Sequence, residues 1–445
     1  MPFRGGQAAS SLRRNFGSVA GGTLLLSGAG LISKILGFFR QWLMAALFGV
    51  SAATDSWLVA SIIPSLLFEI MGGTFGMVMV PLLAGRSDDA DTGAPSSLFL
   101  DEVYSWTLVI GAFLTGLLEL MAPAIVHVIA PGFQFRYPLT VLLLRIMVPA
   151  GFFLVLGNFI NGILQSQRVY HTVAITPALI NAVRIATMVT LGIRWHIVGV
   201  AIGFVAANAA QLAYLVPALE RHNIHLHWRL TGSHPWTRQY LKLAVPTFLS
   251  HMVQIGGTVV DRIFASTLAV GRIAAMNFSQ VLAQMPLTLG LTPFMTTIYA
   301  ELSHAFNQTG SSREFREWAQ HAYEVVLVIM GPFTLGLVFW RLPLVALLYE
   351  HGRFNHSAAL LTSRLVLFWA LSLPGEGLGI VGARILLAQR HTRSASIAGV
   401  IAMASNVVGD FLLVRPLGAE GLVIATGLAG WVRVAVQTGW LIKWR

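Results

Sequence analysis

The chain contains about a dozen apolar stretches that are each long enough to cross a membrane, and several of them carry charged residues. A helix needs about 20 residues to span ~30 Å of hydrocarbon. A charge at the centre of such a helix costs at least ~2.5–3.5 kcal/mol on insertion scales, so it usually faces a protein interior or a water-filled cavity and marks a functional site. We therefore predict a polytopic transporter with a charged internal cavity. The charged residues in question are Lys34, Arg40, Glu69, Asp261, Arg262, Arg384 and Asp410.

Composition supports a membrane protein and argues against two other classes. Hydrophobic residues make up 56% of the chain and charged residues 11%, whereas a soluble domain has roughly 25% charged residues. The net charge of +11 could indicate a nucleic-acid-binding protein, but the basic residues lie mostly in short loops between apolar stretches, as in membrane proteins. We therefore expect no nucleic-acid partner. The absence of cysteine excludes disulfides and thiolate metal sites.

The apolar pattern predicts an all-α polytopic membrane protein with about twelve transmembrane helices. Outside these helices, basic residues are about three times as frequent on one side of the membrane as on the other, which places both termini in the cytoplasm. The predicted helices are 19–48, 54–85, 102–129, 139–165, 172–193, 197–219, 239–269, 272–302, 318–348, 357–388, 394–414 and 419–442.

The two halves of the chain repeat each other. At a constant shift of 222 residues, Gly49 recurs as Gly271, Ala52-Ala53 as Ala274-Ala275, and Pro64 as Pro286. Six helices followed by six in the same orientation predict two pseudo-symmetric lobes, related by an axis along the membrane normal, with a cleft that can open to either side. The predicted domains are a cytoplasmic N-terminal segment 1–18, an N-lobe 19–219, a cytoplasmic linker 220–238 and a C-lobe 239–445.

Short motifs along the whole chain resemble, in order, those of one family of membrane transporters. The motifs are Ser33-Lys34-Ile35-Leu36-Gly37-Phe38-Phe39-Arg40, Phe48-Gly49, Ala53-Thr54-Asp55, Ile63-Pro64, Val80-Pro81, Ala130-Pro131-Gly132-Phe133, Leu144-Arg145-Ile146-Met147-Val148-Pro149, Asn161-Gly162-Ile163-Leu164-Gln165, Asp261-Arg262-Ile263-Phe264-Ala265-Ser266, Arg353-Phe354, Leu373-Pro374 and Ala383-Arg384. With them the chain resembles the MurJ/MviN lipid II flippases of the multidrug/oligosaccharidyl-lipid/polysaccharide (MOP) exporter superfamily.

This resemblance implies a transporter rather than an enzyme. Such a flippase carries a polyprenyl-pyrophosphate-linked sugar, most directly the peptidoglycan precursor lipid II, from the inner to the outer leaflet of the bacterial cytoplasmic membrane by alternating access. Its partners would be the lipid-linked sugar and membrane lipids, and it would act as a monomer. Two alternatives stay open: a flippase for another lipid-linked oligosaccharide in exopolysaccharide export, and a cation-coupled multidrug exporter. The latter predicts an acidic first-lobe cavity, against which Lys34 and Arg40 argue.

Cations in the first helix are the predicted partners of the pyrophosphate. Lys34 and Arg40 are six residues apart, hence about 120° apart on a helix, so both can border one wide cavity. The alternative is that their side chains extend to the membrane interface. For Asp55 two roles are open, a pair with Arg40 or a cap on the second helix. The full predicted substrate set is Lys34, Arg40, Asp55, Glu69 and Arg384.

A second constellation predicts a cation site in the C-lobe. Asn406 and Asp410 are four residues apart, hence on one face of the eleventh helix. With Asp261 on the seventh helix and Thr426 on the twelfth, they form a set of oxygen ligands suited to Na⁺ or to a proton relay. The set resembles the sodium site of some lipid II flippases, and no other cofactor is expected. The alternative interpretation is an Asn–Asp hydrogen bond between helices.

Overall fold

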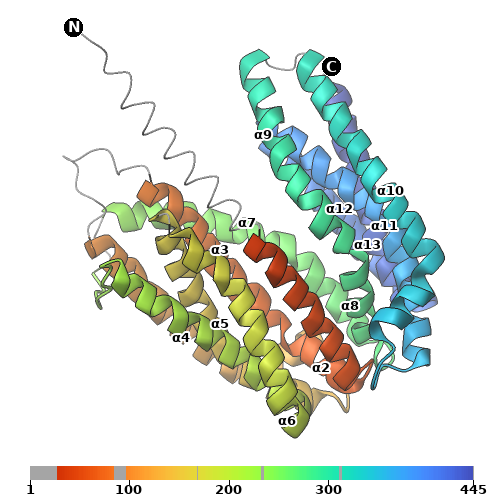
Figure 1. The fold of residues 1–445 in the computed structure, drawn as a ribbon, viewed down its shortest axis with the longest axis horizontal. Helices are drawn as coiled ribbons and strands as arrows, with labels where there is room; N and C mark the ends of the chain where they lie inside the picture. Colours follow the sequence, from red (N-terminus) through yellow and green to blue (C-terminus); the bar gives the residue numbers. More distant parts are fainter. Residues whose placement is uncertain (1–27, 85–96, 168, 232–234, 310–312, 444–445) are drawn as a thin grey trace. The chain divides into compact units, whose positions relative to one another are not determined.

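A computed structural model describes residues 28–84, 97–167, 169–231, 235–309 and 313–443, and the regular structure within these ranges is helical (Figure 1). The helices are Gly28–Phe48, α2 (Ala52–Ala60), α3 (Ile62–Ala84), α4 (Ser97–Ile129), α5 (Tyr137–Ser166), α6 (Tyr170–Arg221), α7 (Pro235–Ser266), α8 (Arg272–Ala283), the π-helical turn η1 (Leu287–Leu291), α9 (Thr292–Thr309), α10 (Arg313–Tyr349), α11 (His356–Ala388), α12 (Thr392–Leu417) and α13 (Ala419–Lys443).

All twelve predicted spans are helical in their described residues, but their boundaries differ from the prediction. The fifth and sixth spans form the single helix α6 of 52 residues, which bends at Trp195 and His196. The eighth span is divided into α8, η1 and α9. Within the described residues, nine helices are long and apolar enough to cross a membrane. In this count α6 appears once, and α7 and the divided eighth span are not among the nine.

The chain divides into two compact units, each built from several segments. The first unit comprises the described residues of Met1–Leu43, Ala60–Pro123 and Val141–Met252. The second comprises those of Met44–Val59, Ala124–Thr140 and Val253–Arg445. The second unit therefore combines the end of α7 and α8 to α13 with α2 and helix ends from the first half of the sequence. The division into lobes 19–219 and 239–445 follows the sequence and stays a prediction.

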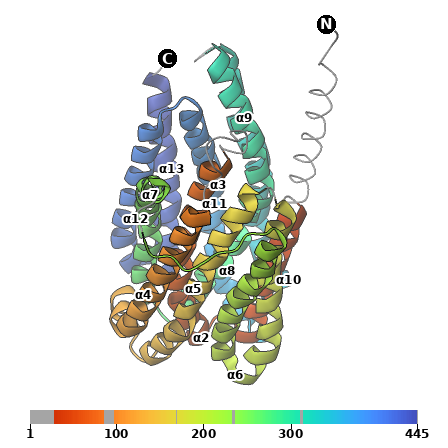
Figure 2. The same ribbon diagram turned by 90° about the vertical axis from the view of Figure 1, so that its left-hand side faces the viewer.

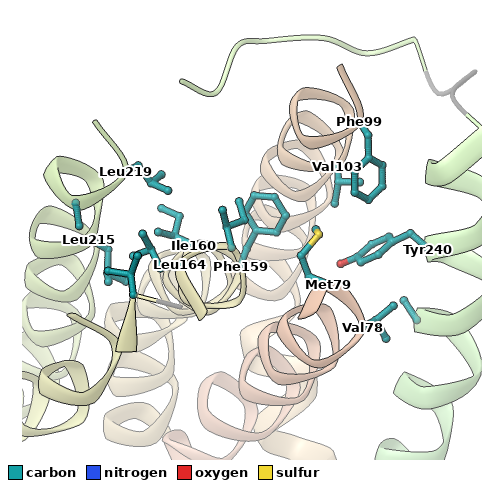
Figure 3. Close-up of a cluster of buried hydrophobic side chains, with 14 residues drawn as sticks. Val78, Met79, Phe99, Val103, Phe159, Ile160, Leu164, Leu215, Leu219 and Tyr240 are labelled. Atoms are coloured by element: carbon teal, nitrogen blue, oxygen red, sulfur yellow. The ribbon is translucent and has the colours of Figure 1, made fainter. Parts of the chain in front are cut away.

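The first unit has a buried core where α3, α4, α5, α6 and the start of α7 meet (Figure 3). Phe159 on α5 has no exposed surface, and its ring stacks on Tyr104 of α4 at 6.3 Å between centroids. Phe99 of α4 contacts Tyr240 of α7 edge-on at 6.1 Å. Because lipid tails are as apolar as these side chains, close packing holds such helices together in a membrane more than hydrophobicity does.

The segment before α7 is bound to the start of α4 within this unit. The backbone N–H of His227 donates to the Asp101 carboxylate at 2.8 Å, and that of Arg229 donates to the Ser105 hydroxyl at 2.7 Å. Glu102 accepts a hydrogen bond from Thr237 at 2.7 Å. This segment is neither helix nor strand, and these bonds attach it and the first turn of α7 to α4.

In the second unit α11 lies between its neighbours and organises the packing. It contacts α8, α9, α10, α12 and α13, and α12 packs in turn along α13. Both views show α11 and α13 running alongside each other (Figures 1 and 2). Gly375 faces Trp431 of α13 so closely that a Cβ at Gly375 would lie 2.9 Å from the indole ring. Glycine on α11 thus lets large α13 side chains approach its backbone.

Candidate functional site

Three polar side chains from α7 and α12 meet inside the second unit. The Asn406 amide nitrogen donates to Asp261 Oδ1 at 2.6 Å and to Asp410 Oδ2 at 3.2 Å. Asp410 has no exposed surface and Asn406 is 6% exposed. The structure therefore brings together three of the four predicted cation ligands, and it also contains the Asn–Asp hydrogen bond of the alternative interpretation.

Oxygen atoms of this cluster remain without partners. Asn406 Oδ1 and Asp410 Oδ1 are buried and have no hydrogen-bond partner among the described residues. The Asp261 and Asp410 carboxyl groups also interact directly. Two carboxylates in contact repel each other, and a buried acceptor without a donor costs about 1–3 kcal/mol. A cation or a proton relieves both penalties, so these residues fit a small hard cation.

The fourth predicted ligand lies in the same cavity. Thr426 on α13 donates its hydroxyl proton to the Leu422 carbonyl at 3.0 Å, which leaves its oxygen lone pairs available. The cavity has a volume of about 410 Å³, and Asp261, Asn406 and Thr426 line it. Within the described ranges, this cluster included, no group of three or more His, Asp or Glu side chains is placed to hold a metal ion; the cluster contributes two carboxylates.

The cavity also has lining residues that sequence reasoning missed. Gln284, the C-cap residue of α8, contributes an amide, and it carries no signal in the sequence beyond its place in a mainly apolar stretch. Glu376 and Arg433 contribute opposite charges from α11 and α13. Arg433 donates to the backbone carbonyl of Glu376 at 3.3 Å. These two charges lie in predicted spans, but only the packing of α11 on α13 places them beside the cation ligands.

Asp55 has partners that the sequence did not predict. Its carboxylate accepts from Arg136 Nη1 at 2.9 Å, from the Gly271 N–H at 2.6 Å and from the Ala274 N–H at 2.9 Å. Gly271 is the N-cap of α8, with φ +85° and no capping side chain of its own. Asp55 therefore caps α8 in the other half of the sequence. The expected pair with Arg40 and the expected cap on its own helix are replaced by these contacts.

The contact region around Asp55 repeats the internal symmetry of the chain. A Cβ at Gly132 would overlap the backbone carbonyl of Ser266 at the end of α7. A Cβ at Gly352 would overlap the carbonyl of Ala46 at the end of the first helix. Gly352 lies 220 positions after Gly132, and Ala46 lies 220 positions before Ser266. The two halves of the sequence thus interlock through equivalent close approaches that require glycine, all within the second unit.

The two predicted cations of the first helix belong to the first unit. Asn181 of α6 donates to the Ser33 carbonyl at 3.1 Å, and Gly37 lies against the same Asn181 side chain. At 100° per residue, Lys34 and Arg40 flank Gly37 by about 60° on either side. Lys34 is exposed and Arg40 half-buried. Both cations therefore border the face of the helix that contacts α6.

The remaining predicted substrate residues are dispersed. Glu69 lies on α3, and its side chain is outside the described part of the structure. Arg384 is exposed on α11, and its guanidinium lies 5.3 Å from the centre of the Tyr299 ring. Asp55 is fully buried in the second unit. Of the predicted substrate set, Lys34 and Arg40 thus share a helix of the first unit, while Asp55 and Arg384 lie on different helices of the second unit.

Comparisons with known proteins point to one family of membrane transporters. A family model described as lipid II flippase MurJ matches residues 44–444. A probable lipid II flippase MurJ of Rhizobium meliloti (strain 1021) is 27% identical over 448 residues, which cover 98% of this chain and 81% of that protein. A solved structure of lipid II flippase MurJ in an inward closed conformation superposes with a TM-score of 0.83 at 26% identity, over 94% of this chain and 87% of the other.

A second solved structure shares the fold. It is an inward-facing multidrug resistance MATE family transporter of the MOP superfamily, with a TM-score of 0.75 over 92% of this chain and 93% of the other. Its identity of 13% is low, so this likeness concerns the arrangement of helices alone.

Proposed function

The chain belongs to the lipid II flippase MurJ family, and we propose that it carries lipid II from the inner to the outer leaflet of the bacterial cytoplasmic membrane. The observation that carries this proposal is the match of the family model over residues 44–444, nearly the whole chain. We further propose that it works as a monomer with both termini in the cytoplasm, in contact with membrane lipids.

In this proposal Lys34 and Arg40 bind the pyrophosphate and compensate its charge. An isolated anion in hydrocarbon costs on the order of tens of kcal/mol, so the charge must be compensated throughout the crossing. Arg40 offers a planar fork that can bind two phosphate oxygens, while Lys34 acts as a point charge. Arg384 is a further candidate contact, and Glu69 would act by titrating or by pairing with a nearby cation. Asp55 is assigned to holding α8 rather than to touching substrate.

The experiment that tests the substrate is genetic rescue. A bacterium depleted of its own lipid II flippase should grow when this chain is produced at normal abundance in its membrane. Failure to rescue at that abundance, combined with restored export of another lipid-linked oligosaccharide in a matching mutant, would move the substrate to exopolysaccharide export.

We also propose that Asp261, Asn406, Asp410 and Thr426 bind Na⁺ as the coupling ion. The unpartnered oxygens of Asn406 and Asp410 support this assignment. When bound, the ion supplies positive charge between two carboxylates and connects α7, α12 and α13. It can bias one access state only by as much as its affinity differs between the two states.

Replacing Asp410 by alanine should abolish stabilisation by sodium. A ligand that binds only the folded protein adds RT ln(1 + [L]/Kd), about 2.7 kcal/mol at a hundredfold excess over Kd. The wild-type protein in detergent should therefore melt at a higher temperature in NaCl than in choline chloride of equal ionic strength. Asp410→Ala should melt at the same temperature in both salts, while Lys34→Ala should respond like the wild type.

One result would remove the sodium assignment. If the wild-type melting temperature is the same in both salts, the cluster serves as an interhelical hydrogen bond, and protons become the candidate driving ion.

A further inference from the structure

A row of polar side chains continues from the cation cavity along α13. Thr426 lines the cavity, Arg433 follows seven residues later and Gln437 four residues after that. Spacings of seven and four residues place all three on one face of the helix. Arg433 also lines the cavity, so Gln437 is the next residue of this face toward the end of α13.

The facing surface of α11 makes room for these side chains. Gly379 and Gly382 are three residues apart, so they share a face of that helix. A Cβ at Gly379 would overlap the guanidinium of Arg433. A Cβ at Gly382 would overlap the amide of Gln437 and would lie 3.0 Å from the hydroxyl of Tyr323 on α10. Polar groups from α10 and α13 thus converge on a glycine surface of α11.

Several of these polar atoms lack hydrogen-bond partners. Gln437 is 1% exposed, and neither its amide nitrogen nor its amide oxygen has a partner within the described residues. The Nε of Arg433 is buried and has none there either. An amide buried without hydrogen bonds costs several kcal/mol in an apolar medium, and such groups in native proteins are commonly satisfied by ordered water.

We propose that Arg433, Gln437 and Tyr323 line a hydrated passage from the cation cavity to the end of the second unit where α10 begins and α13 ends. The basic residues at this end predict that it faces the cytoplasm. They are Arg313, Arg316, Arg390, Arg393 and Lys443. The passage is the route by which the cation site exchanges with that side. The identity of the ion rests on the proposed function, whereas the presence of water does not.

The charges along the passage suit a cation. Arg433 alone would repel a cation that leaves the cavity. Glu376 lines the same cavity and interacts electrostatically with Arg433, so the positive charge is offset locally. Beyond the pair, the neutral groups of Gln437 and Tyr323 can solvate an ion without trapping it. Polar residues at membrane depth typically mark such ion pathways.

Water in the passage can be measured with a single cysteine, because the chain has none of its own. Gln437→Cys should react with a charged, water-soluble methanethiosulfonate reagent, since only a hydrated thiol forms the reactive thiolate readily. Labelling should occur in vesicles that expose the cytoplasmic side to the reagent. The depth-matched control is Ala435→Cys, which continues the exposed apolar surface of Leu428 and Trp431 on the same helix and should label at least tenfold more slowly.

A second variant keeps the test valid if Gln437→Cys does not fold. Tyr323→Cys approaches the same point from α10 and should label in the same way. Equal, slow labelling of the passage cysteines and of Ala435→Cys would overturn the passage.

A kinetic measurement links the passage to ion exchange. A bulky label on Gln437→Cys should slow the sodium-induced change in tryptophan fluorescence at least tenfold and leave the equilibrium Kd unchanged. An unchanged rate would overturn the role of the passage in exchange. Rapid cysteine labelling in a protein that does not bind sodium would leave the hydrated passage standing and remove the proposed coupling ion.

Discussion

Replacing Asp55 by alanine is expected to lower the free energy of unfolding by about 3–5 kcal/mol, because removing one partner of a buried ion pair leaves the other charge buried and unpaired. Arg136 is 5% exposed and would keep its contacts with the Leu268 carbonyl and with the Phe133 and Phe135 rings, none of which carries a negative charge. The N–H groups of Gly271 and Ala274 would also lose their acceptor at the start of α8. Melting in detergent, together with abundance in the membrane, measures the loss.

A matched control distinguishes the effect of a buried ion pair on stability from that of an exposed one. Arg313 and Glu317 form an ion pair of similar length, 2.8 Å, but their side chains are 91% and 61% exposed. Glu317→Ala should change stability by no more than about 0.5 kcal/mol, as expected for an exposed pair one helical turn apart. Asp55→Asn should fall between alanine and wild type, because it keeps an acceptor but loses the charge. Equal melting temperatures for Asp55→Ala and Glu317→Ala would show that the buried contacts contribute nothing.

The second large effect concerns transport rather than stability. The double replacement of Lys34 and Arg40 by alanine should abolish rescue of a flippase-depleted cell while leaving membrane insertion and abundance unchanged. Without these cations the pyrophosphate would cross an apolar helix surface with its charge uncompensated. Lys34→Arg should retain rescue, because it keeps a cation at the same position.

A charge-matched control rules out a general effect of lower net charge. The double replacement of Arg313 and Arg316 by alanine removes the same two charges from the start of α10. It should rescue growth like the wild type. Normal growth of cells that depend on the Lys34/Arg40 double variant would remove both residues from the substrate site.

The helical pattern was predictable because it depends on local sequence alone. Apolar stretches of sufficient length, ended by turns such as Gly49-Val50-Ser51, locate the helical segments. The divisions within helices were not predictable from the same signal. The break between α8 and α9 around η1 lies inside one long, mainly apolar stretch, and the bend of α6 at His196 requires a positive φ of 51° that composition does not reveal.

The residues of the candidate sites likewise divide into those that the sequence can pair and those that it cannot. Asn406 and Asp410 could be paired from the sequence because helical spacing sets which residues share a face. The partners of Asp55 could not, because Arg136 and Gly271 are 81 and 216 residues away and only the folded second unit brings them together. In the sequence Arg136 lies between the predicted helices 102–129 and 139–165, where a basic residue is ordinarily exposed. Its burial depends on tertiary contacts that a single sequence does not encode locally.

The central claim, that this chain moves lipid II across the membrane, is tested most directly by measuring which leaflet holds lipid II. Cells depleted of their own flippase can be converted to spheroplasts and treated with an external enzyme that cleaves the lipid–pyrophosphate bond. Cells producing this chain should yield cleaved lipid II at close to the level of undepleted cells, and cells producing the Lys34/Arg40 double variant should yield only the level of depleted cells. Lipid II that stays protected from the enzyme while the wild-type chain is present in the membrane would contradict the claim.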